Sequence, residues 1–293
     1  SELTIAAQVE LENGTSNQIG VQMSTKHFSG RINQQAAVNR AELASVLPIQ
    51  LIHPKSYELL DAGPQLRREF LDWGVFNSDE QFLPAWRKFK KALLQRNALL
   101  KARQPRYINV WDKELADYGT IVSEYRQSYL SKLLPVLAQI LNTFLGPKSL
   151  DLRFISGWDE SKSLQQALID DLEKDLRYGF THSGPHRGDF QLLINNRLAK
   201  DFVSRGQLKL LVLSLKLAQV QLLINEQQKQ TCILIDDFAA ELDMLNRGKL
   251  LDFLDSIGCQ AFITATELAE FGDVTRVKDY NMFHMEHGTI TKM

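Results

Sequence analysis

The stretch that decides the fold is Thr231-Cys-Ile-Leu-Ile-Asp-Asp237. Its first five residues show no alternation of apolar and polar side chains, which is typical of a parallel strand buried on both faces. Residues 259–264 form a second run of this kind, and residues 246–256 between the two runs have a helical pattern. Because strand, helix and strand follow in that order, we predict a parallel α/β sheet. Both cysteines, Cys232 and Cys259, fall in these runs, and we interpret them as buried structural thiols.

Two carboxylates, Asp236 and Asp237, end the first of these strands. The carboxyl ends of strands are where open α/β sheets bind their ligands. Adjacent carboxylates repel each other unless a cation or a hydrogen-bond donor lies between them. Mg²⁺ takes one or two carboxylates and leaves its other positions to water and phosphate. The pair by itself fits a nucleotide site and a structural strand end about equally well.

A helix start lies upstream, in Ser204-Arg-Gly-Gln-Leu-Lys209. Ser204 and Gln207 have the spacing of a capping box. Gly206 costs helix stability in the first turn but lets a ligand approach the backbone closely. Residues 208–224 are apolar almost all round and must be buried, so the exposed end of this helix would offer N–H groups to an anion. An ordinary helix N-cap is the competing interpretation.

The rest of the chain has clear periodicities. Residues 3–32 alternate apolar and polar side chains around Asn13-Gly14, which predicts an antiparallel hairpin. Residues 48–52 are typical of a short strand. Helical stripes dominate from about residue 63 to 180, and we expect two of these helices to form an antiparallel hairpin, the second kinked at Pro135.

The composition is that of a soluble globular protein of about two domains. The 293 residues are 44% hydrophobic and 24% charged, with a formal net charge of −1. We find no apolar run long enough to suggest a membrane span and no secretory signal at the N-terminus, so we expect a cytoplasmic protein that does not bind a membrane. Because the net charge is near zero, a site for a polyanion must be a local patch. One candidate lies between Arg87 and Arg106, where eight basic residues occur without an acidic one, although a solvated helix face is the commoner explanation of such a run.

The order of these motifs resembles that of an ABC-type ATPase cassette. A Ser-x-Gly-Gln helix start, a buried helix, a strand that ends in Asp236-Asp237 and then Ala240-Glu-Leu-Asp243 follow one another. In that family the helix start is the signature loop, which contacts the γ-phosphate of ATP held by a partner subunit. The resemblance implies nucleotide contact for Ser204, Gly206, Gln207, Lys209 and Asp243, magnesium binding for Asp236, activation of the attacking water for Asp237, and a D-loop at the dimer interface for Ala240 to Asp243. Gln50 would be the metal-sensing glutamine of such cassettes, and an ordinary polar strand residue is the competing interpretation.

Three further segments narrow the resemblance. Gly63-Pro-Gln-Leu-Arg-Arg-Glu-Phe-Leu-Asp72, the segment 90–100 and Gly184-Pro-His-Arg-Gly-Asp-Phe190 resemble segments of the RecF family of bacterial recombination mediators. The resemblance runs from about Leu47 to the C-terminus. It implies a single-cassette ATPase of the SMC and Rad50 class, with a globular head and short helical arms. Members of the family dimerise with ATP, bind duplex DNA and work with RecO and RecR to load RecA at gapped, damaged DNA.

The resemblance predicts a mixed α/β fold in which an ABC-type ATPase head carries an inserted, mostly helical arm domain. We expect residues 1–62 to belong to the β-rich N-terminal ATPase lobe, 63–183 to the arm, and 184–293 to the C-terminal part of the ATPase. The implied partners are double-stranded and single-stranded DNA, RecR, RecO and a second copy of the chain, in DNA repair, replication and the SOS response. The candidate DNA contacts are Arg67, Arg68, Lys88, Lys91, Arg96, His186 and Arg187. Another SMC- or Rad50-like DNA-processing ATPase and a non-catalytic DNA-binding module are the alternatives.

One element of the family pattern is missing from the sequence. We find no Gly-x-x-x-x-Gly-Lys-Ser/Thr phosphate loop (Walker A motif), since the segment 14–21 lacks the lysine. We therefore expect the chain to begin after that loop. ATP and Mg²⁺ would then be cofactors of the full-length protein, a weak DNA-dependent ATPase, and would not be bound by this inactive piece. Lys55 and Ala62 also depart from the pattern, which has an acidic residue and a glycine at these positions.

Overall fold

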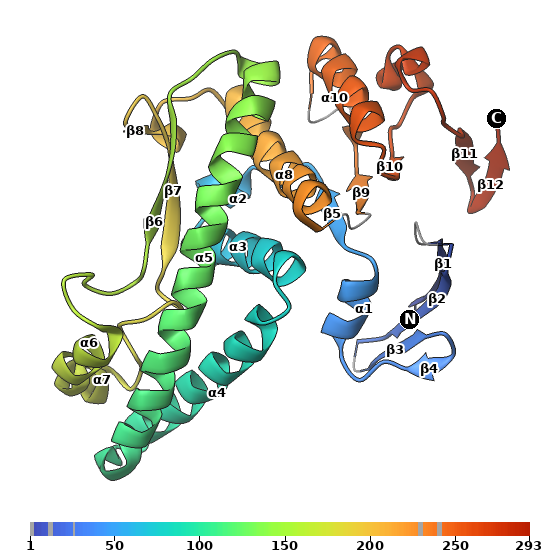
Figure 1. Ribbon diagram of the computed structural model, residues 1–293. Coiled ribbons are helices and arrows are strands. Elements are labelled where there is room, and N and C mark those ends of the chain that lie inside the picture. The colour runs from blue at the N-terminus through green and yellow to red at the C-terminus, as the bar shows by residue number, and fades with distance from the viewer. Residues whose placement is uncertain (1–2, 11–13, 26, 228–230, 239–241) are drawn as a thin grey trace. The chain divides into compact units, whose positions relative to one another are not determined.

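The computed structural model describes residues 3–10, 14–25, 27–227, 231–238 and 242–293 (Figure 1). The chain forms two compact units. The first combines Ser1–Pro54 with Gln230–Met293, and the second is Lys55–Lys229. The second unit is therefore an insertion between two parts of the first.

The first unit contains the predicted parallel sheet. Its strands are β5 (Ile49–Ile52), β9 (Cys232–Ile235) and β10 (Ala261–Ile263), in the order β10-β9-β5. Both pairings are parallel, and Ile235 stands in register with Ile52 and with Ile263. Helix α10 (Met244–Ile257) connects β9 to β10. The strand–helix–strand prediction is confirmed, except that Cys259 lies before β10 and not within it.

An antiparallel sheet precedes these strands in the chain. It has the order β1-β2-β3-β4, with β1 (Leu3–Glu10), β2 (Ser16–Met23), β3 (Phe28–Ile32) and β4 (Gln35–Ala36). The predicted hairpin between β1 and β2 is confirmed, although Asn13 of its turn lies outside the described residues. Helix α1 (Arg40–Val46) follows, capped by the side chain of Asn39. After β10 come two short 3₁₀ helices, η3 (Leu268–Phe271) and η4 (Val274–Arg276), and a hairpin of β11 (Phe283–Glu286) and β12 (Thr289–Lys292).

The second unit is mostly helical and is built around one long helix. This helix, α5 (Ile108–Leu145), packs against α4 (Phe82–Lys101) as the predicted antiparallel hairpin and also against α8 (Arg205–Gln227). Pro135 lies inside α5, which continues past it. The remaining elements are α2 (Glu58–Asp61), α3 (Pro64–Ser78), η1 (Pro105–Tyr107), β6 (Leu150–Ile155), α6 (Leu164–Asp170), α7 (Leu172–Tyr178), β7 (Asp189–Ile194), β8 (Arg197–Leu198) and η2 (Ala199–Asp201).

The boundaries of the units differ from those expected from the sequence. They fall at residues 54/55 and 229/230, whereas the sequence suggested 62/63 and 183/184. The physical reason is that β7 pairs with β6, with Leu192 opposite Leu152, and that α8 packs against α5. Residues 184–229 therefore share a core with the helical unit.

Helix α8 is long and apolar enough to cross a membrane by length and composition alone. Lys209 and Lys216 interrupt the apolar run, so it does not stand out in the sequence as a membrane span. Within its most apolar window 72% of the residues are buried in the protein, and leucines around its whole circumference lie in the core. This is the burial expected of a core helix that is apolar on all sides.

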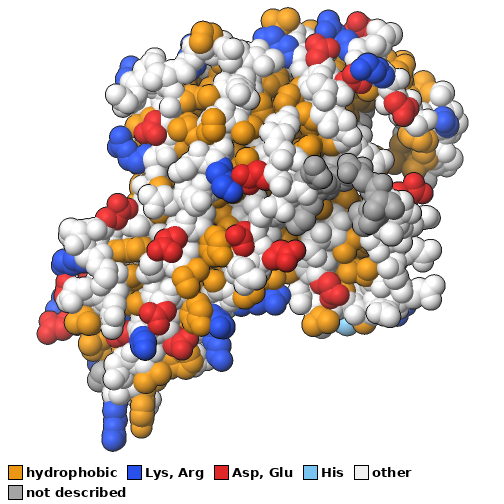
Figure 2. Space-filling model, viewed as in Figure 1, with side chains coloured by type: hydrophobic (Ala, Val, Ile, Leu, Met, Phe, Trp, Pro, Cys, Tyr) orange, Lys and Arg blue, Asp and Glu red, His pale blue; other side chains and the backbone are white. Residues whose placement is uncertain are grey.

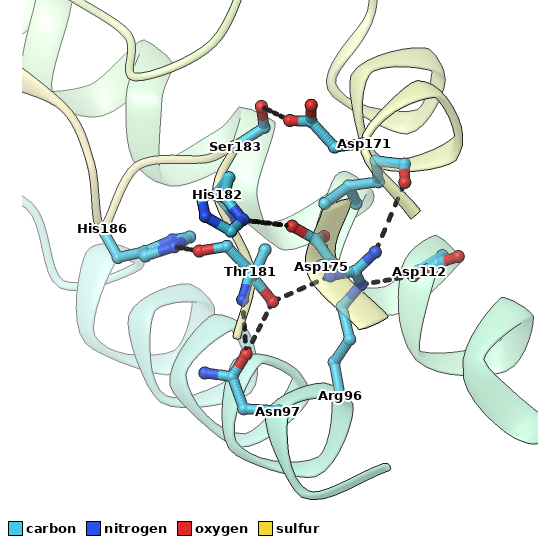
Figure 3. A network of polar contacts seen from close by, with 10 residues as sticks. Arg96, Asn97, Asp112, Asp171, Asp175, Thr181, His182, Ser183 and His186 are labelled. Carbon is cyan, nitrogen blue, oxygen red and sulfur yellow. Dashed lines mark hydrogen bonds and ion pairs between the residues drawn. The ribbon is translucent and has the colours of Figure 1, made fainter. Parts of the chain in front are cut away.

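A buried arginine, Arg96 of α4, joins four segments of the second unit (Figure 3). Its side chain is fully buried and pairs with Asp112 of α5, at 2.6 Å, and with Asp175 of α7. It also donates hydrogen bonds to Thr181 Oγ1 and to the carbonyl oxygen of Leu168. Buried charges are tolerated only when they are paired and hydrogen-bonded, as these are. The network therefore fixes α4, α5, α6 and α7 relative to one another.

We expect Arg96→Met to lower the free energy of unfolding by about 3–5 kcal/mol, because it leaves two carboxylates buried without a cation. Urea denaturation followed by circular dichroism measures the change. Arg87→Met, on the exposed side of the same helix, is the control and should change stability by no more than about 0.5 kcal/mol. Equal stability of both variants would show that Arg96 does not organise this core.

Candidate functional site

Asp236 lies directly after β9, at the carboxyl edge of the parallel sheet. Its backbone N–H donates to the carbonyl oxygen of Ile52 at 2.9 Å, which holds the residue beside the end of β5. Its Oδ1 accepts a hydrogen bond from Thr264 Oγ1 at 2.8 Å. The residue is exposed, so its other carboxylate oxygen faces solvent-accessible space. The strand end thus presents an oriented carboxylate at the position predicted from the sequence.

Asp237 adopts a left-handed backbone conformation, with φ +53°. This region is uncommon for residues other than glycine, and aspartate and asparagine are among those that tolerate it. The backbone N–H of Asp237 donates to Thr264 Oγ1 at 3.0 Å, so one hydroxyl contacts both acidic residues. The Thr264 hydroxyl is the hydrogen-bond donor that the sequence leads us to expect beside one of the two carboxylates, that of Asp236.

Thr264 is a site residue that the sequence analysis did not identify as one. It follows β10, and its backbone N–H donates to the carbonyl oxygen of Ile235 while its own carbonyl accepts from Phe238. Its position in the sequence could have identified it, since a residue that follows the second parallel strand must lie at the same edge of the sheet as Asp236. Thr264 orients Asp236 through its hydroxyl and holds the turn at Asp237.

The chemistry of this edge suits a hard cation that retains water and phosphate ligands. Among the residues that the structure describes, no group of three or more His, Cys, Asp and Glu side chains could hold a metal ion. A cage made entirely of protein ligands, such as Ca²⁺ or structural Zn²⁺ requires, is not present there. One or two carboxylates are what Mg²⁺ takes when a phosphate supplies the remaining ligands. Asp236, whose carboxylate is oriented by Thr264, fits that role.

Gln50 lies in β5 and not at its end. It stands opposite Ile233, two positions before the last residue of the strand, and it is buried. Gln50 therefore lies within the sheet and not at the edge where Asp236 lies. Its metal-sensing role stays a prediction.

The predicted helix start is confirmed by the geometry of α8. Ser204 Oγ accepts from the N–H of Gln207 at 3.2 Å, and Gln207 Oε1 accepts from the N–H of Ser204 at 3.0 Å. This reciprocal pair is a complete capping box. A Cβ atom placed on Gly206 would meet no atom within 4 Å, so the backbone there is open to a ligand. Lys209 is half-buried one turn further on.

Asp243, the last residue of the expected D-loop, caps helix α10. Its Oδ1 accepts from the N–H of Asn246 at 2.8 Å and its Oδ2 from the side-chain amide of the same residue at 3.0 Å. Ala240 and Glu241 lie outside the described residues. The structure gives Asp243 a capping role, and its contact with a nucleotide remains a prediction.

Two of the predicted DNA contacts are wrong. Arg96 is fully buried in the network described above. Arg67 is also buried: it forms a two-pronged ion pair with Asp189, at 2.7 and 3.0 Å, and donates to the carbonyl oxygens of Leu59, Leu60 and Ala62. Both guanidinium groups are buried and hydrogen-bonded to carboxylates and carbonyl oxygens of the protein, so neither is presented to a phosphate.

The remaining candidates lie at or near the surface. Lys88 and Lys91 are exposed on α4, where Lys88 donates to Tyr118 Oη at 2.8 Å. Arg187 is exposed, whereas Arg68 is half-buried and donates to the carbonyl oxygen of Gly188 at 2.9 Å. Figure 2 shows Lys and Arg side chains along the α4 side of the helical unit. This face could contact phosphates by charge alone.

His186 is not a cationic contact. Burial lowers the pKa of His186 to about 4, and the positive charges of Arg187, Lys90 and Arg68 lower it as well. Its ring is therefore neutral at pH 7. His186 Nε2 lies 3.0 Å from the carbonyl oxygen of Thr181, which assigns the ring proton to Nε2 (Figure 3). The residue holds its loop in place and does not attract phosphate by charge.

The chain matches the family described as RecF/RecN/SMC N terminal domain over residues 4–291. It is 41% identical over 261 residues to the DNA replication and repair protein RecF of Vibrio cholerae serotype O1, covering 89% of this chain and 72% of that protein. It is 37% identical over 293 residues to RecF of Pseudomonas aeruginosa, covering 99% of this chain and 79% of that protein.

Solved structures share the fold. The structure titled recombination mediator protein RecF-ATP in the RecFOR pathway superimposes with a TM-score of 0.87 at 24% identity, over 100% of this chain and 80% of that one. The Smc head domain of Pyrococcus furiosus, with an extended coiled coil, gives 0.54 at 12% identity, over 100% of this chain and 76% of that one. The expected mixed α/β ATPase-head fold is confirmed.

We expect Asp237→Asn to leave the free energy of unfolding within about 0.5 kcal/mol of the parent, because asparagine tolerates the left-handed backbone. Asp237→Val should lower it by about 1–2 kcal/mol, since a β-branched side chain is strained there. Chemical denaturation of both variants measures the difference. Asp237→Gly is the control and should be at least as stable as the parent. A valine variant as stable as the asparagine variant would contradict the conformation of this turn.

Proposed function

Because the chain belongs to the RecF/RecN/SMC N-terminal domain family, whose matched relatives are DNA replication and repair proteins, we propose that it is the ATP-dependent, DNA-binding part of a recombination mediator. In this proposal the whole mediator dimerises with ATP and Mg²⁺, binds duplex and single-stranded DNA, and acts with RecO and RecR to load RecA. The observation that carries the proposal is the edge formed by Asp236, Asp237 and Thr264, because it presents two carboxylates at the end of a central parallel strand.

The two carboxylates have separable roles in this proposal. Asp236, oriented by the Thr264 hydroxyl, would hold Mg²⁺, and the cation would neutralise charge on the phosphates of ATP. Asp237 would accept a hydrogen bond from the attacking water and orient it. A hydrogen bond and the left-handed turn hold the backbone of Asp237, so the residue would project from a turn that is ordered before the nucleotide binds.

The start of α8 would act on a nucleotide held by a second copy of the chain. Ser204 and Gly206 lie on an exposed helix start, and the helix behind them is buried and rigid. A helix N-terminus favours negative charge, and an open glycine lets a phosphate approach the backbone. This placement supports dimerisation that depends on ATP, because the γ-phosphate completes the contact.

Duplex DNA would bind through cations on the exposed side of α4. Lys88 and Lys91 are exposed there, together with Arg87 and Lys90, and the family resemblance assigns no base-reading element to this helix. Such a face contacts phosphates and ignores bases, so affinity should be independent of sequence and should fall steeply with salt.

We test the nucleotide site with Asp237→Asn in the longest polypeptide that the gene encodes. Hydrolysis of Mg-ATP should fall about 100-fold or more, because the amide is nearly isosteric but cannot accept a proton from water. ATP-dependent dimerisation, measured by sedimentation velocity, should persist.

Asp252→Asn, an exposed acid on α10 that pairs with Arg276 at 2.8 Å, is the matched control and should hydrolyse ATP at the parent rate. Asp236→Asn should weaken dimerisation as well as hydrolysis. If Asp237→Asn retains the parent rate, the proposed role of this carboxylate is wrong.

A further inference from the structure

A cluster of aromatic rings lies on the second unit, where α7 ends. We call Tyr178, Phe180, His182 and Arg187 the ring patch. The first three alternate along the chain, and their rings contact one another: Phe180 and His182 have centroids 4.3 Å apart, and Tyr178 lies 5.4 Å from His182 and 6.2 Å from Phe180. The guanidinium carbon of Arg187 lies 5.1 Å from the centroid of Phe180. The planar groups therefore form one continuous surface.

The outer part of this patch is open to solvent. Tyr178 is 59% exposed, whereas Phe180 is 36% exposed and contacts both Arg187 and His182. Tyrosines that pack into a core do not remain this exposed. Tyr178 contacts its neighbours at tilted and edge-on angles, 46° to Phe180 and 66° to His182. The patch therefore offers a tyrosine ring with a supporting layer behind it.

Hydrogen bonds to Asn97 and Asp175 hold the segment that carries the rings (Figure 3). Asn97 Oδ1 accepts from Thr181 N at 2.8 Å and from Thr181 Oγ1 at 2.7 Å. Asp175 Oδ1 accepts from the backbone N–H of His182 at 3.1 Å and lies 2.6 Å from His182 Nδ1. Asp175 also pairs with the buried Arg96, so the ring segment is tied to the core network.

The loop that presents Arg187 is equally fixed. Arg126 donates to the carbonyl oxygen of Pro185 at 2.7 Å, and Arg68 donates to that of Gly188 at 2.9 Å. A Cβ atom on Gly157 would lie 2.3 Å from the carbonyl oxygen of Gly184, so the neighbouring chain passes too closely for any side chain at that position. Arg187 thus projects from a loop whose two sides are both anchored. A surface that is ordered before binding loses little entropy on binding.

Two cations lie against the segment that carries the rings. Arg187 contacts Phe180, and His186 next to it in the chain, whose pKa burial lowers, has Arg68 and Lys90 nearby, which lower that pKa further. Lys101 lies against Gly179, between Tyr178 and Phe180 in sequence, with its Cγ 3.5 Å from the position of a Cβ there. The nearby carboxylates of Asp72 and Asp189 pair with Arg126 and Arg67 and also lie close to Arg68, whereas Arg187 and Lys101 form no ion pair with any of the described residues. The surface therefore complements a polyanion that also has flat apolar faces.

We propose that the ring patch binds single-stranded DNA by stacking an unpaired base on Tyr178, while Lys101 and Arg187 contact the flanking phosphates. This rests on the proposed function and adds to it the site at which unpaired bases bind. Stacked aromatic side chains and tracking cations are the general means by which proteins bind single strands. A duplex offers phosphates but keeps its bases stacked on one another. An acidic peptide would use the cations but not the exposed ring face, so single-stranded DNA uses more of this surface.

The test compares two DNA molecules by fluorescence anisotropy: a duplex with a short single-stranded gap, and the same duplex without the gap. Tyr178→Ala should weaken binding of the gapped duplex about 5- to 100-fold, the range expected for one stacked base, and should change binding of the continuous duplex less than about twofold. Tyr178→Phe should retain the parent affinity for both. Because Tyr178 is exposed, neither change removes a core contact.

A fluorescent base provides a second readout. 2-Aminopurine placed in the gap should lose fluorescence on binding the parent, because stacking quenches it, and should keep its fluorescence with Tyr178→Ala. Phe202→Ala is the matched control: Phe202 is 40% exposed and has the guanidinium of Arg197 4.6 Å from its centroid. It follows β8, at the end of the helical unit away from α7 in Figure 1. This control should behave as the parent on both DNA molecules.

The possible results distinguish a failure of the stacking site from a failure of the proposed function. Three results would overturn the stacking site and leave the proposed function intact. Tyr178→Ala could lose equal affinity for the gapped and the continuous duplex, it could lose affinity for neither, or Phe202→Ala could lose as much affinity as Tyr178→Ala. Binding of a polyglutamate peptide that Tyr178→Ala abolishes, with gapped-DNA affinity unchanged, would make the patch a protein-docking surface and also overturn it. A parent that binds neither DNA molecule would refute DNA binding itself, and the proposed function with it.

Discussion

The parallel pairing of β5 with β9 is the constraint on which the rest of the structure depends. The two strands are hydrogen-bonded neighbours, yet the whole helical unit lies between them in the chain. The pairing brings the end of β9, with Asp236, beside the end of β5 and, through β10, beside Thr264. A long insertion between paired strands adds little closure entropy, because that cost rises only with the logarithm of loop length. A large unit can therefore be inserted without disturbing the sheet edge.

The inserted unit is organised by arginine–carboxylate pairs. Arg67 pairs with Asp189, Arg96 with Asp112 and Asp175, and Arg126 with Asp72. Arg96–Asp112 joins the neighbouring helices α4 and α5, and the other pairs join elements far apart in sequence. The guanidinium groups also donate to backbone carbonyls. Buried ion pairs contribute little net stability compared with apolar packing, but they penalise any arrangement that separates them. We infer that they set the relative positions of α3, α4, α5 and β7, and so the position of the ring patch.

Local signals in the sequence were sufficient for the two motifs. The capping box of Ser204 and Gln207 depends on residues three apart, and the apolar run before Asp236 indicates a buried strand without knowledge of its neighbours. The Asn13-Gly14 signal likewise predicted the pairing of β1 with β2. In each case, the interaction that fixes the element lies within a few residues or follows a simple period.

The errors concern residues whose environment is set by distant parts of the chain. A run of basic residues looks the same in the sequence whether its side chains are exposed or buried. Arg96 is buried because its partners Asp112 and Asp175, which lie on other helices, pair with it in the core. Arg67 depends in the same way on Asp189. Thr264 was missed because its role arises only when β10 lies beside β9. The compact units divide at 229/230 and not at 183/184, because β7 pairs antiparallel with β6 and α8 packs against α5, which comes much earlier in the chain.

Amide hydrogen exchange at β9 tests the central claim most directly. The N–H groups of Cys232 and Asp236 donate to the carbonyl oxygens of Pro48 and Ile52 on the β5 side, whereas the N–H of Ile233 donates to Gln260 on the β10 side. If β5 and β9 are paired across the insertion, all three amides exchange far more slowly than in an unstructured peptide. Protection of Ile233 alone, with Cys232 and Asp236 exchanging at the unstructured rate, would show that β9 pairs only with β10 and would contradict the account.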